Sequence, residues 1–214
     1  MARVAVFGGS FNPIHYGHLL LADEMLELLA LDRVLFVPAG QPPHKPSGAV
    51  APAAHRHAMV RLATAGHPRF AVSDLELRRP GLSYTVDTLE ALAASGDQLL
   101  LLIGSETFLD LLSWRAPRRI AELAQLVVVP RTGSAFDPDS TAAQKVLREI
   151  GADGFAAAGG ATVAARAVLI AHVTSLPLSA SDLRSRARER RSLAFRLPDS
   201  VIEYIRAHRL YEAA

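Results

Sequence analysis

The chain has 214 residues, half of them hydrophobic, and it contains no cysteine. This composition provides a sizeable core, and it excludes a disordered protein, disulfides, thiol catalysis and cysteine metal sites. The net charge is only +2, so charge alone implies no acidic partner. No run approaches the roughly 18 apolar residues of a membrane span, and the N-terminal segment lacks the features of a signal peptide. We therefore expect a cytoplasmic protein with no membrane partner.

The beginning of the chain predicts a strand, a helix and a second strand. Residues 4–7 form an apolar run that ends at a glycine pair, and residues 16–29 carry apolar side chains at helical spacing. Residues 33–37 form a second apolar run, which is closed by a proline. This order predicts two parallel strands joined by a crossover helix.

Strands continue to alternate with helices along the chain. Further strands are predicted over residues 70–74, 99–103, 126–129 and 168–172, and helices over residues 55–65, 85–94, 107–112, 120–124, 179–190 and 199–207. The alternation predicts an α/β fold in which a doubly wound parallel sheet has helices on both faces. No domain boundary is evident, so we expect one domain over residues 1–214 with a C-terminal helical part from residue 178.

Two segments interrupt this pattern. Residues 38–52 hold five prolines and two glycines, which predicts a loop. Residues 132–165 are rich in glycine, alanine, serine and aspartate, and a short helix over residues 146–150 is the one element predicted there. We expect this second segment to be variable.

The most informative segment joins the first strand to the first helix and reads Gly-Gly-Ser-Phe-Asn-Pro-Ile-His-Tyr-Gly-His over residues 8–18. In such sheets ligands bind beyond the carboxyl ends of strands, and N–H groups at a helix start attract phosphate oxygens. Gly8 and Gly9 let a ligand approach the backbone. His15 and His18, three residues apart, present two imidazole donors on one side of the helix start. The alternatives are an ordinary turn, structural histidines or half of a metal site; no third ligand stands at motif spacing, so we expect no metal there.

The pattern Gly-x-Phe-x-Pro-x-His-x-Gly-His resembles the signature of the His-x-Gly-His nucleotidyltransferase superfamily. The resemblance implies a Rossmann-like fold and transfer of a nucleotidyl group with release of pyrophosphate, with Mg²⁺ accompanying ATP. It also implies ATP contacts from Gly8, Gly9, Ser10, Phe11, His15, Gly17 and His18.

Residues 178–184 read Leu-Ser-Ala-Ser-Asp-Leu-Arg and resemble the second signature of the superfamily, with Ala180 in place of a serine. From the residues alone, Ser179 followed three positions later by an acidic residue is an ordinary helix N-cap. The resemblance implies instead that Ser179, Ser181 and Arg184 bind the β- and γ-phosphates. We interpret the arginine-rich run that follows as a solvated helix surface and expect no nucleic-acid partner.

Residues 36–45, 83–89, 102–108 and 197–211 resemble segments of bacterial nicotinate-nucleotide adenylyltransferases. This resemblance covers most of the chain and implies nicotinate mononucleotide as the acceptor. It implies acceptor contacts from Asn12, His44, Lys45, Thr85, Trp114 and Arg131, and ATP contacts from Gly104 and Glu106. The plainer interpretations are a solvated charge for Lys45, core packing for Trp114, a helix N-cap for Thr85 and a surface position for Arg131.

Three positions besides Ala180 depart from the family pattern. Asn12 and Glu106 stand where the family has aspartate, and Arg115 stands where some members have tyrosine. The first two departures concern contacts with the nucleotides, and the third concerns the pyridine site.

The expected reaction is in-line attack of the acceptor's 5′-phosphate on the α-phosphorus of ATP, with neither a general base nor a covalent intermediate. His15, His18, Lys45 and Arg184 are the expected catalytic residues. The expected partners are ATP and a pyridine mononucleotide, and the sequence leaves a homo-oligomer open. Nicotinamide mononucleotide or phosphopantetheine as the acceptor, and a non-catalytic nucleotide sensor, remain as alternatives.

Overall fold

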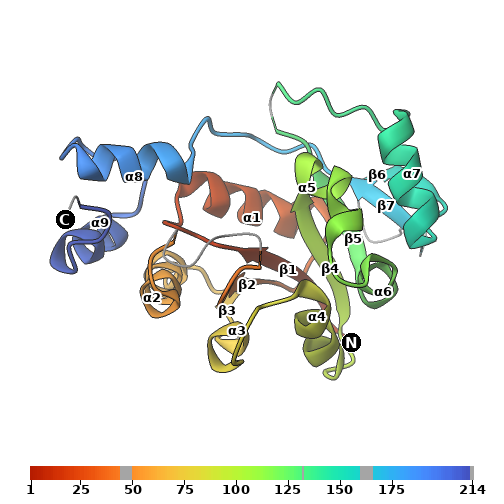
Figure 1. Cartoon of the computed structure of the whole chain (residues 1–214), viewed down its shortest axis with the longest axis horizontal. Coiled ribbons are helices and arrows are strands. Elements are labelled where there is room, and N and C mark those ends of the chain that lie inside the picture. The colour runs from red at the N-terminus through yellow and green to blue at the C-terminus, as the bar shows by residue number, and fades with distance from the viewer. Residues whose placement is uncertain (44–49, 132, 160–165, 213–214) are drawn as a thin grey trace.

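The computed structural model describes residues 1–43, 50–131, 133–159 and 166–212. In this part of the chain seven strands form one sheet, and all neighbouring strands are parallel. Across the sheet the order is β3-β2-β1-β4-β5-β7-β6 (Figure 1). The strands are β1 (Arg3–Gly9), β2 (Arg33–Pro38), β3 (Phe70–Val72), β4 (Gln98–Gly104), β5 (Gln125–Val129), β6 (Gly154–Ala157) and β7 (Ala167–Ile170).

The strand order changes direction between β1 and β4. From β1 the chain moves outward through β2 to β3, and it then returns to place β4 on the other side of β1. Gly9 at the end of β1 pairs with Pro38 of β2, whereas Val6 pairs with Leu101 of β4. The carboxyl ends of β1 and β4 therefore form the switch point at which doubly wound sheets bind ligands.

Helices cover both faces of the sheet, as predicted. One face is covered by α1 (Tyr16–Leu28) and α2 (Ala53–Thr64), and side chains of α8 (Ala180–Arg188) and α9 (Asp199–Ala207) join the same core, with α9 packed against α2. The other face packs against α4 (Thr85–Ala93), α5 (Ser105–Leu109), α6 (Pro117–Leu123) and α7 (Thr141–Ile150). Two short elements, α3 (Leu75–Arg78) and the 3₁₀ helix η1 (Leu111–Ser113), complete the described elements.

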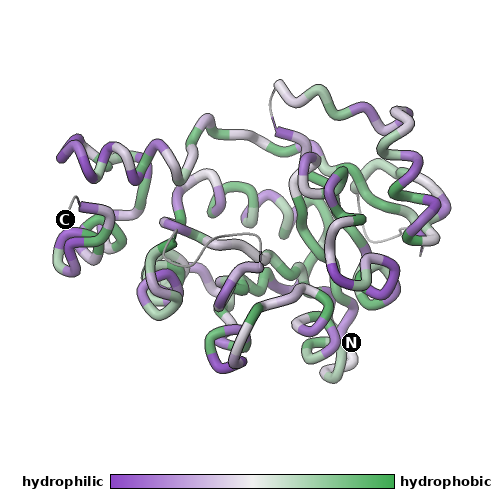
Figure 2. The backbone as a smooth tube through the Cα atoms, viewed as in Figure 1, coloured by the Kyte–Doolittle hydropathy of each residue, from purple (hydrophilic) through white to green (hydrophobic). Residues whose placement is uncertain are grey.

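The strands are apolar along their length because both of their faces are covered. In β4, Leu100 and Leu102 belong to the core under α1, while Leu101 and Ile103 belong to the core under α4 and α5. Figure 2 shows the same arrangement, with hydrophobic strands in the centre and hydrophilic stretches on the outer helices. None of the helices in the described ranges is long and apolar enough to cross a membrane.

Most predicted elements are confirmed, and α9 has the predicted bounds. The single helix predicted over residues 107–112 is wrong, since α5 ends at Leu109 and η1 follows. Helix α7 is longer than predicted because Ser140 caps its start and Gly151, with φ 74°, ends it. Neither α3 nor β6 was predicted from the sequence. Strand β6 is four residues long with Phe155 as its one large apolar side chain, and it lies at the sheet edge, where β7 is its only partner among the described strands.

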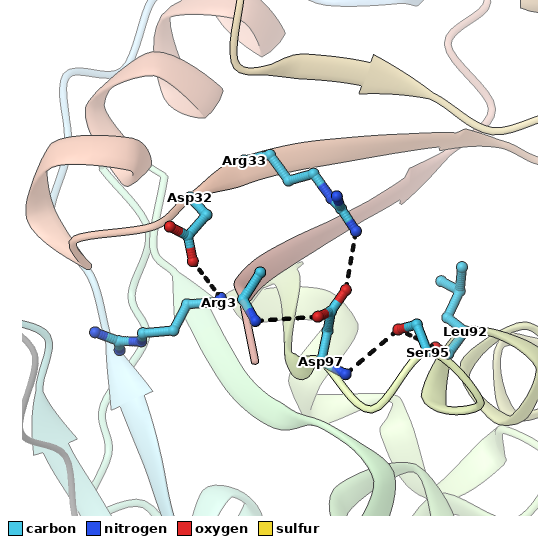
Figure 3. A network of polar contacts seen from close by, with 7 residues as sticks. Arg3, Asp32, Arg33, Leu92, Ser95 and Asp97 are labelled. Carbon is cyan, nitrogen blue, oxygen red and sulfur yellow. Dashed lines mark hydrogen bonds and ion pairs between the residues drawn. The ribbon is translucent and has the colours of Figure 1, made fainter.

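A polar network joins the amino ends of the central strands (Figure 3). Asp97, just before β4, accepts hydrogen bonds from the N–H of Ala2 at 3.0 Å and from the guanidinium of Arg33 at 2.9 Å. Asp32 accepts from the N–H of Arg3 at 2.6 Å. The bond from Ala2 lowers the pKa of Asp97, which keeps this carboxylate ionised. The network links β1 to β2 and β4 and so supports the register that brings their carboxyl ends together.

Candidate active site

The loop between β1 and α1, residues 10–15, turns sharply over the buried side chain of Phe11. Phe11 has a left-handed φ of 43°, and a Cβ on Gly9 would lie 3.2 Å from its ring. A Cβ on Gly8 would meet no atom within 4 Å. Gly9 therefore serves the packing of the loop, while Gly8 leaves exposed backbone that a ligand can approach.

His15 and His18 lie together at the start of α1, as predicted. Their rings stack with centroids 3.7 Å apart and planes 28° apart. His15 is the N-cap residue, and its backbone N–H donates to Nδ1 of His18 at 3.2 Å. In neutral His18 the ring proton therefore lies on Nε2, which is a hydrogen-bond donor. A side chain at Gly17 would disturb the pair, because its Cβ would lie 3.1 Å from Nδ1 of His15.

Both imidazoles are neutral at physiological pH. Burial, assisted by the positive charge of Arg131, lowers the pKa of His15 to about 4. Burial, the neighbouring His15 and Arg131 lower the pKa of His18 well below its usual value. Nδ1 of His15 is buried and has no hydrogen-bond partner in the described part of the chain. The pair thus offers uncharged donors, and the positive charge for an anionic ligand comes from arginines.

Arg56, which was not predicted as a site residue, connects two loops around this site. It lies on α2 and is 0% exposed. Its guanidinium donates to the carbonyl oxygens of Ser10 at 2.9 Å, Gly40 at 3.0 Å and Ala51 at 2.8 Å. The planar fork of an arginine suits such divergent acceptors. One buried cation thereby ties the β1–α1 loop to both ends of the proline-rich segment.

Gly40, at the start of the proline-rich segment, is packed against residues that follow β3. Its N–H donates to the carboxylate of Glu76 at 3.3 Å, and that carboxylate also accepts from the hydroxyl of Thr88 at 2.7 Å. A Cβ at Gly40 would overlap the carbonyl oxygen of Glu76 and lie 2.9 Å from Oγ of Ser83. Close approach of backbone to backbone therefore requires glycine here.

Asn12 is buried in the β1–α1 loop and receives hydrogen bonds from three segments. Its side-chain oxygen accepts from the N–H of Ala51 at 3.1 Å and from the hydroxyl of Tyr211 at 2.9 Å. Its backbone carbonyl accepts from Arg184 at 2.9 Å. Arg184 thus reaches this loop from α8, and its contact with a phosphate stays a prediction. A contact of Asn12 with the acceptor stays a prediction, since its side-chain oxygen already has two donors within the protein.

The start of α8 has the predicted N-cap. The hydroxyl of Ser179 accepts from the N–H of Asp182 at 3.1 Å, so this hydroxyl and this N–H are already paired. Ser181 is exposed in the first turn. Its contact with a phosphate stays a prediction.

The end of β4 forms the opposite side of the switch point. Ser105 is buried just after Gly104, and its hydroxyl is bonded to that of Ser134 at 3.1 Å. Glu106 is exposed, and its Oε2 lies 3.6 Å from the position that a Cβ on Gly104 would take. The carboxylate therefore folds back toward the end of β4.

Two aromatic side chains border the core on the α4 face, Tyr84 just before α4 and Trp114 just after η1. Trp114 and Tyr84 are partly buried and both pack against the core on the α4 face. The guanidinium of Arg115 lies 5.0 Å from the centroid of the Tyr84 ring and 3.5 Å from the carboxylate of Asp87. Tyr84 is the N-cap of α4, so the interpretation of Thr85 as that N-cap is wrong.

An open pocket of about 330 Å³ lies beyond the carboxyl ends of β5 and β7. Arg131 and Ser134 line it after β5, His172 lines it after β7, and Phe136 contributes apolar surface. The positive charge of Arg131 contributes to the lowered pKa of both site histidines. The predicted contacts of His44 and Lys45 lie outside the described residues.

Comparisons with known proteins show the family of this chain. The family model of cytidylyltransferase-like proteins matches residues 6–186. A probable nicotinate-nucleotide adenylyltransferase of Thermomicrobium roseum is 42% identical over 99% of this chain and 92% of its own length. Another, from Thermus thermophilus, is 40% identical over 98% of this chain and 99% of its own length. The chain belongs to the nicotinate-nucleotide adenylyltransferases.

The fold of this adenylyltransferase chain is similar to that of solved nicotinic acid mononucleotide adenylyltransferase structures. A Plasmodium falciparum nicotinic acid mononucleotide adenylyltransferase complexed with NaAD aligns with a TM-score of 0.74 over 99% of this chain and 98% of its own. Only 17% of the aligned residues are identical, so this likeness concerns the fold.

Two residues at the site of this adenylyltransferase chain, Arg56 and Tyr211, were not predicted, because the sequence around each gives little indication of its role. Arg56 stands in a helical pattern, where an arginine is most often a solvated side chain. Tyr211 belongs to a C-terminal segment that resembles the family, but no motif assigns it a role. Their partners come from distant parts of the chain, and only contacts in the folded protein identify them.

Proposed function

We propose that the chain transfers the adenylyl group of ATP to nicotinate mononucleotide, giving nicotinate adenine dinucleotide and pyrophosphate. The stacked, neutral pair of His15 and His18 at the mouth of β1 carries this proposal. The pair lies at the switch point of the sheet, in a chain with adenylyltransferase relatives at about 40% identity. Uncharged imidazole donors beside arginines suit a polyphosphate whose charge changes during reaction.

In the proposed reaction the acceptor's 5′-phosphate attacks the α-phosphorus in line with the departing pyrophosphate. This phosphate is already ionised at neutral pH, so no general base is required. Catalysis then consists of positioning and charge stabilisation. We assign Nε2–H of His18 to the reacting phosphate, with His15 beside it. Arg184 and Lys45 supply positive charge to the ATP phosphates.

We assign the acceptor to the region between Arg131 and the two aromatic residues near α4. Arg131 is an exposed cation at the end of β5, which suits the acceptor's phosphate. Trp114 and Tyr84 offer flat surfaces for a pyridine ring. Thr85, in the first turn of α4, can donate to the pyridine carboxylate.

A magnesium ion fits this site as a companion of the triphosphate. In the described ranges no three His, Asp or Glu side chains gather to hold a metal, so the ligands we assign to Mg²⁺ are phosphate oxygens and water. When bound, the ion neutralises phosphate charge. The chain's own part is to hold the nucleotide through the β1–α1 loop and the start of α8.

A pyrophosphate-release assay tests the function directly. The chain is incubated with ATP, Mg²⁺ and one of three acceptors: nicotinate mononucleotide, nicotinamide mononucleotide or phosphopantetheine. We expect the highest kcat/KM with nicotinate mononucleotide. A higher value with another acceptor would reject the assigned substrate, and ATP binding without pyrophosphate release for any acceptor would favour a nucleotide sensor.

Replacing His18 tests the assigned donor. We expect His18→Ala to lower kcat about 10²–10³-fold, the usual loss when a single transition-state donor is removed. His67→Ala is the matched control, because His67 lies away from the site and bonds to Asp23. Thermal unfolding of both variants checks that they fold. Near-wild-type turnover in folded His18→Ala would refute the role of His18.

A further inference from the structure

The C-terminal segment reaches the β1–α1 loop through Tyr211, which the proposed reaction does not use. Tyr211 follows α9, and its hydroxyl donates to Oδ1 of Asn12, 199 positions earlier in the chain. Asn12 lies three residues before His15, the first of the two site histidines. We propose that Tyr211 is a positioning residue for adenylyl transfer, which holds the β1–α1 loop through Asn12 so that His15 and His18 face the triphosphate. This inference rests on the proposed function of the same site.

The contacts of Asn12 show how the loop depends on Tyr211. Asn12 is only 3% exposed, and its side-chain oxygen has two donors, Ala51 and Tyr211. Arg184 donates to its carbonyl, and Arg56 donates to the carbonyl of Ser10 two residues earlier. Loss of the Tyr211 hydroxyl removes one of two side-chain contacts while the backbone contacts remain. The expected result is a shifted loop in a folded protein.

Tyr211 itself is held firmly in place. It has a left-handed φ of 66°, and a non-glycine residue keeps such a conformation where the surrounding structure enforces it. The preceding Leu210 is buried in the core on the α1 face. Burial also raises the pKa of the Tyr211 hydroxyl, which therefore stays protonated and able to donate.

Tyr211→Phe removes the hydroxyl alone, and Tyr204→Phe is its matched control. The hydroxyl of Tyr204, on α9, is bonded to Nδ1 of His55 at 2.9 Å, so the control loses a comparable bond elsewhere. For each protein we would measure the Kd of α,β-methylene-ATP, kcat and KM with ATP and nicotinate mononucleotide, and the urea midpoint. We expect Tyr211→Phe to weaken analogue binding and kcat/KM about two- to tenfold. Tyr204→Phe should leave both unchanged.

A double variant tests the route through Asn12. In an Asn12→Ala background, Tyr211→Phe should cause no further loss, because the contact it removes is already gone. Additive losses would overturn the proposal. So would a Tyr211→Phe protein with wild-type Kd and kinetics, whatever its urea midpoint. If Asn12→Ala does not fold, the comparison of Tyr211→Phe with Tyr204→Phe decides alone.

The two proposals can fail separately. If the wild-type chain binds α,β-methylene-ATP but transfers nothing to nicotinate mononucleotide, the proposed function fails, and the binding comparison still decides the role of Tyr211. If the wild-type chain does not bind the analogue, both proposals are overturned.

Discussion

Acidification should destabilise the folded protein through His15. Burial lowers the pKa of His15 from the ordinary 6.5 to about 4, with Arg131 adding to the effect. Above pH 6.5 the ring is neutral in both the folded and the unfolded chain, so its contribution to stability is complete. As the pH falls from 6.5 to 4, the unfolded chain takes up a proton that the folded protein refuses. The free energy of unfolding should fall by about 3 kcal/mol over this window, and by about 2 kcal/mol at pH 5.

Urea unfolding at pH 7.5 and pH 5.0 measures this loss, with His15→Gln as the reference protein. The variant lacks the titrating ring but keeps the carboxylates, together with His18 and His57, whose pKa values are also lowered. Subtracting the pH effect in the variant from that in the wild type gives the contribution of His15, including its effect on the pKa of His18. We expect the wild type to lose about 2 kcal/mol more than the variant between the two pH values.

Equal losses in the two proteins would refute the reasoning. An NMR titration of the His15 ring gives an independent answer, because a neutral, buried imidazole should remain unprotonated at pH 5. A measured pKa at or above 6 would show that the ring is solvated in the folded protein. The description of His15 and His18 as uncharged donors would then have to be abandoned.

Two further predictions follow from the same contacts. Gly40→Ala should lower the free energy of unfolding by about 2 kcal/mol, because the new Cβ would press on Glu76 and Ser83. The control is Gly66→Ala, where nothing lies within 4 Å of a Cβ. Similar urea midpoints for the two variants would contradict the packing argument. Binding of α,β-methylene-ATP at pH 5.5 should be accompanied by proton uptake, since phosphate charge raises the pKa of His15 and His18. Calorimetry in buffers of different ionisation enthalpy measures that uptake, and identical enthalpies in all buffers would refute it.

The fold was largely predictable because its elements have strong local patterns. The continuous apolar run of β4 and the helical spacing in α1 and α9 each fall within one segment of the chain. Strand β6 was not predictable in this way. Its four residues include one large apolar side chain and do not distinguish a strand from a loop, and its conformation depends on pairing with β7, which lies later in the sequence.

In the candidate site, too, the features set by neighbouring residues were predictable, and those set by distant contacts were not. Residues 8–18 run from the end of β1 through one loop into the first turn of α1, so their spacing was enough to predict that His15 and His18 lie side by side. The N-cap at Ser179 was equally local, because its partner is only three residues away. Charge states were not predictable, since the lowered pKa values of the histidines depend on burial and on Arg131.

Residue types and short spacings were therefore sufficient for the glycine turn, the histidine pair and the parallel sheet that presents them. Only the tertiary structure decided that Arg56 is buried and that the hydroxyl of Tyr211 donates a hydrogen bond to Asn12. The physical reason is that a buried polar group is satisfied by whichever donors and acceptors the folded chain brings within about 3 Å. For Arg56 these are three carbonyl oxygens from two loops, and for Asn12 they include a hydroxyl from the other end of the protein.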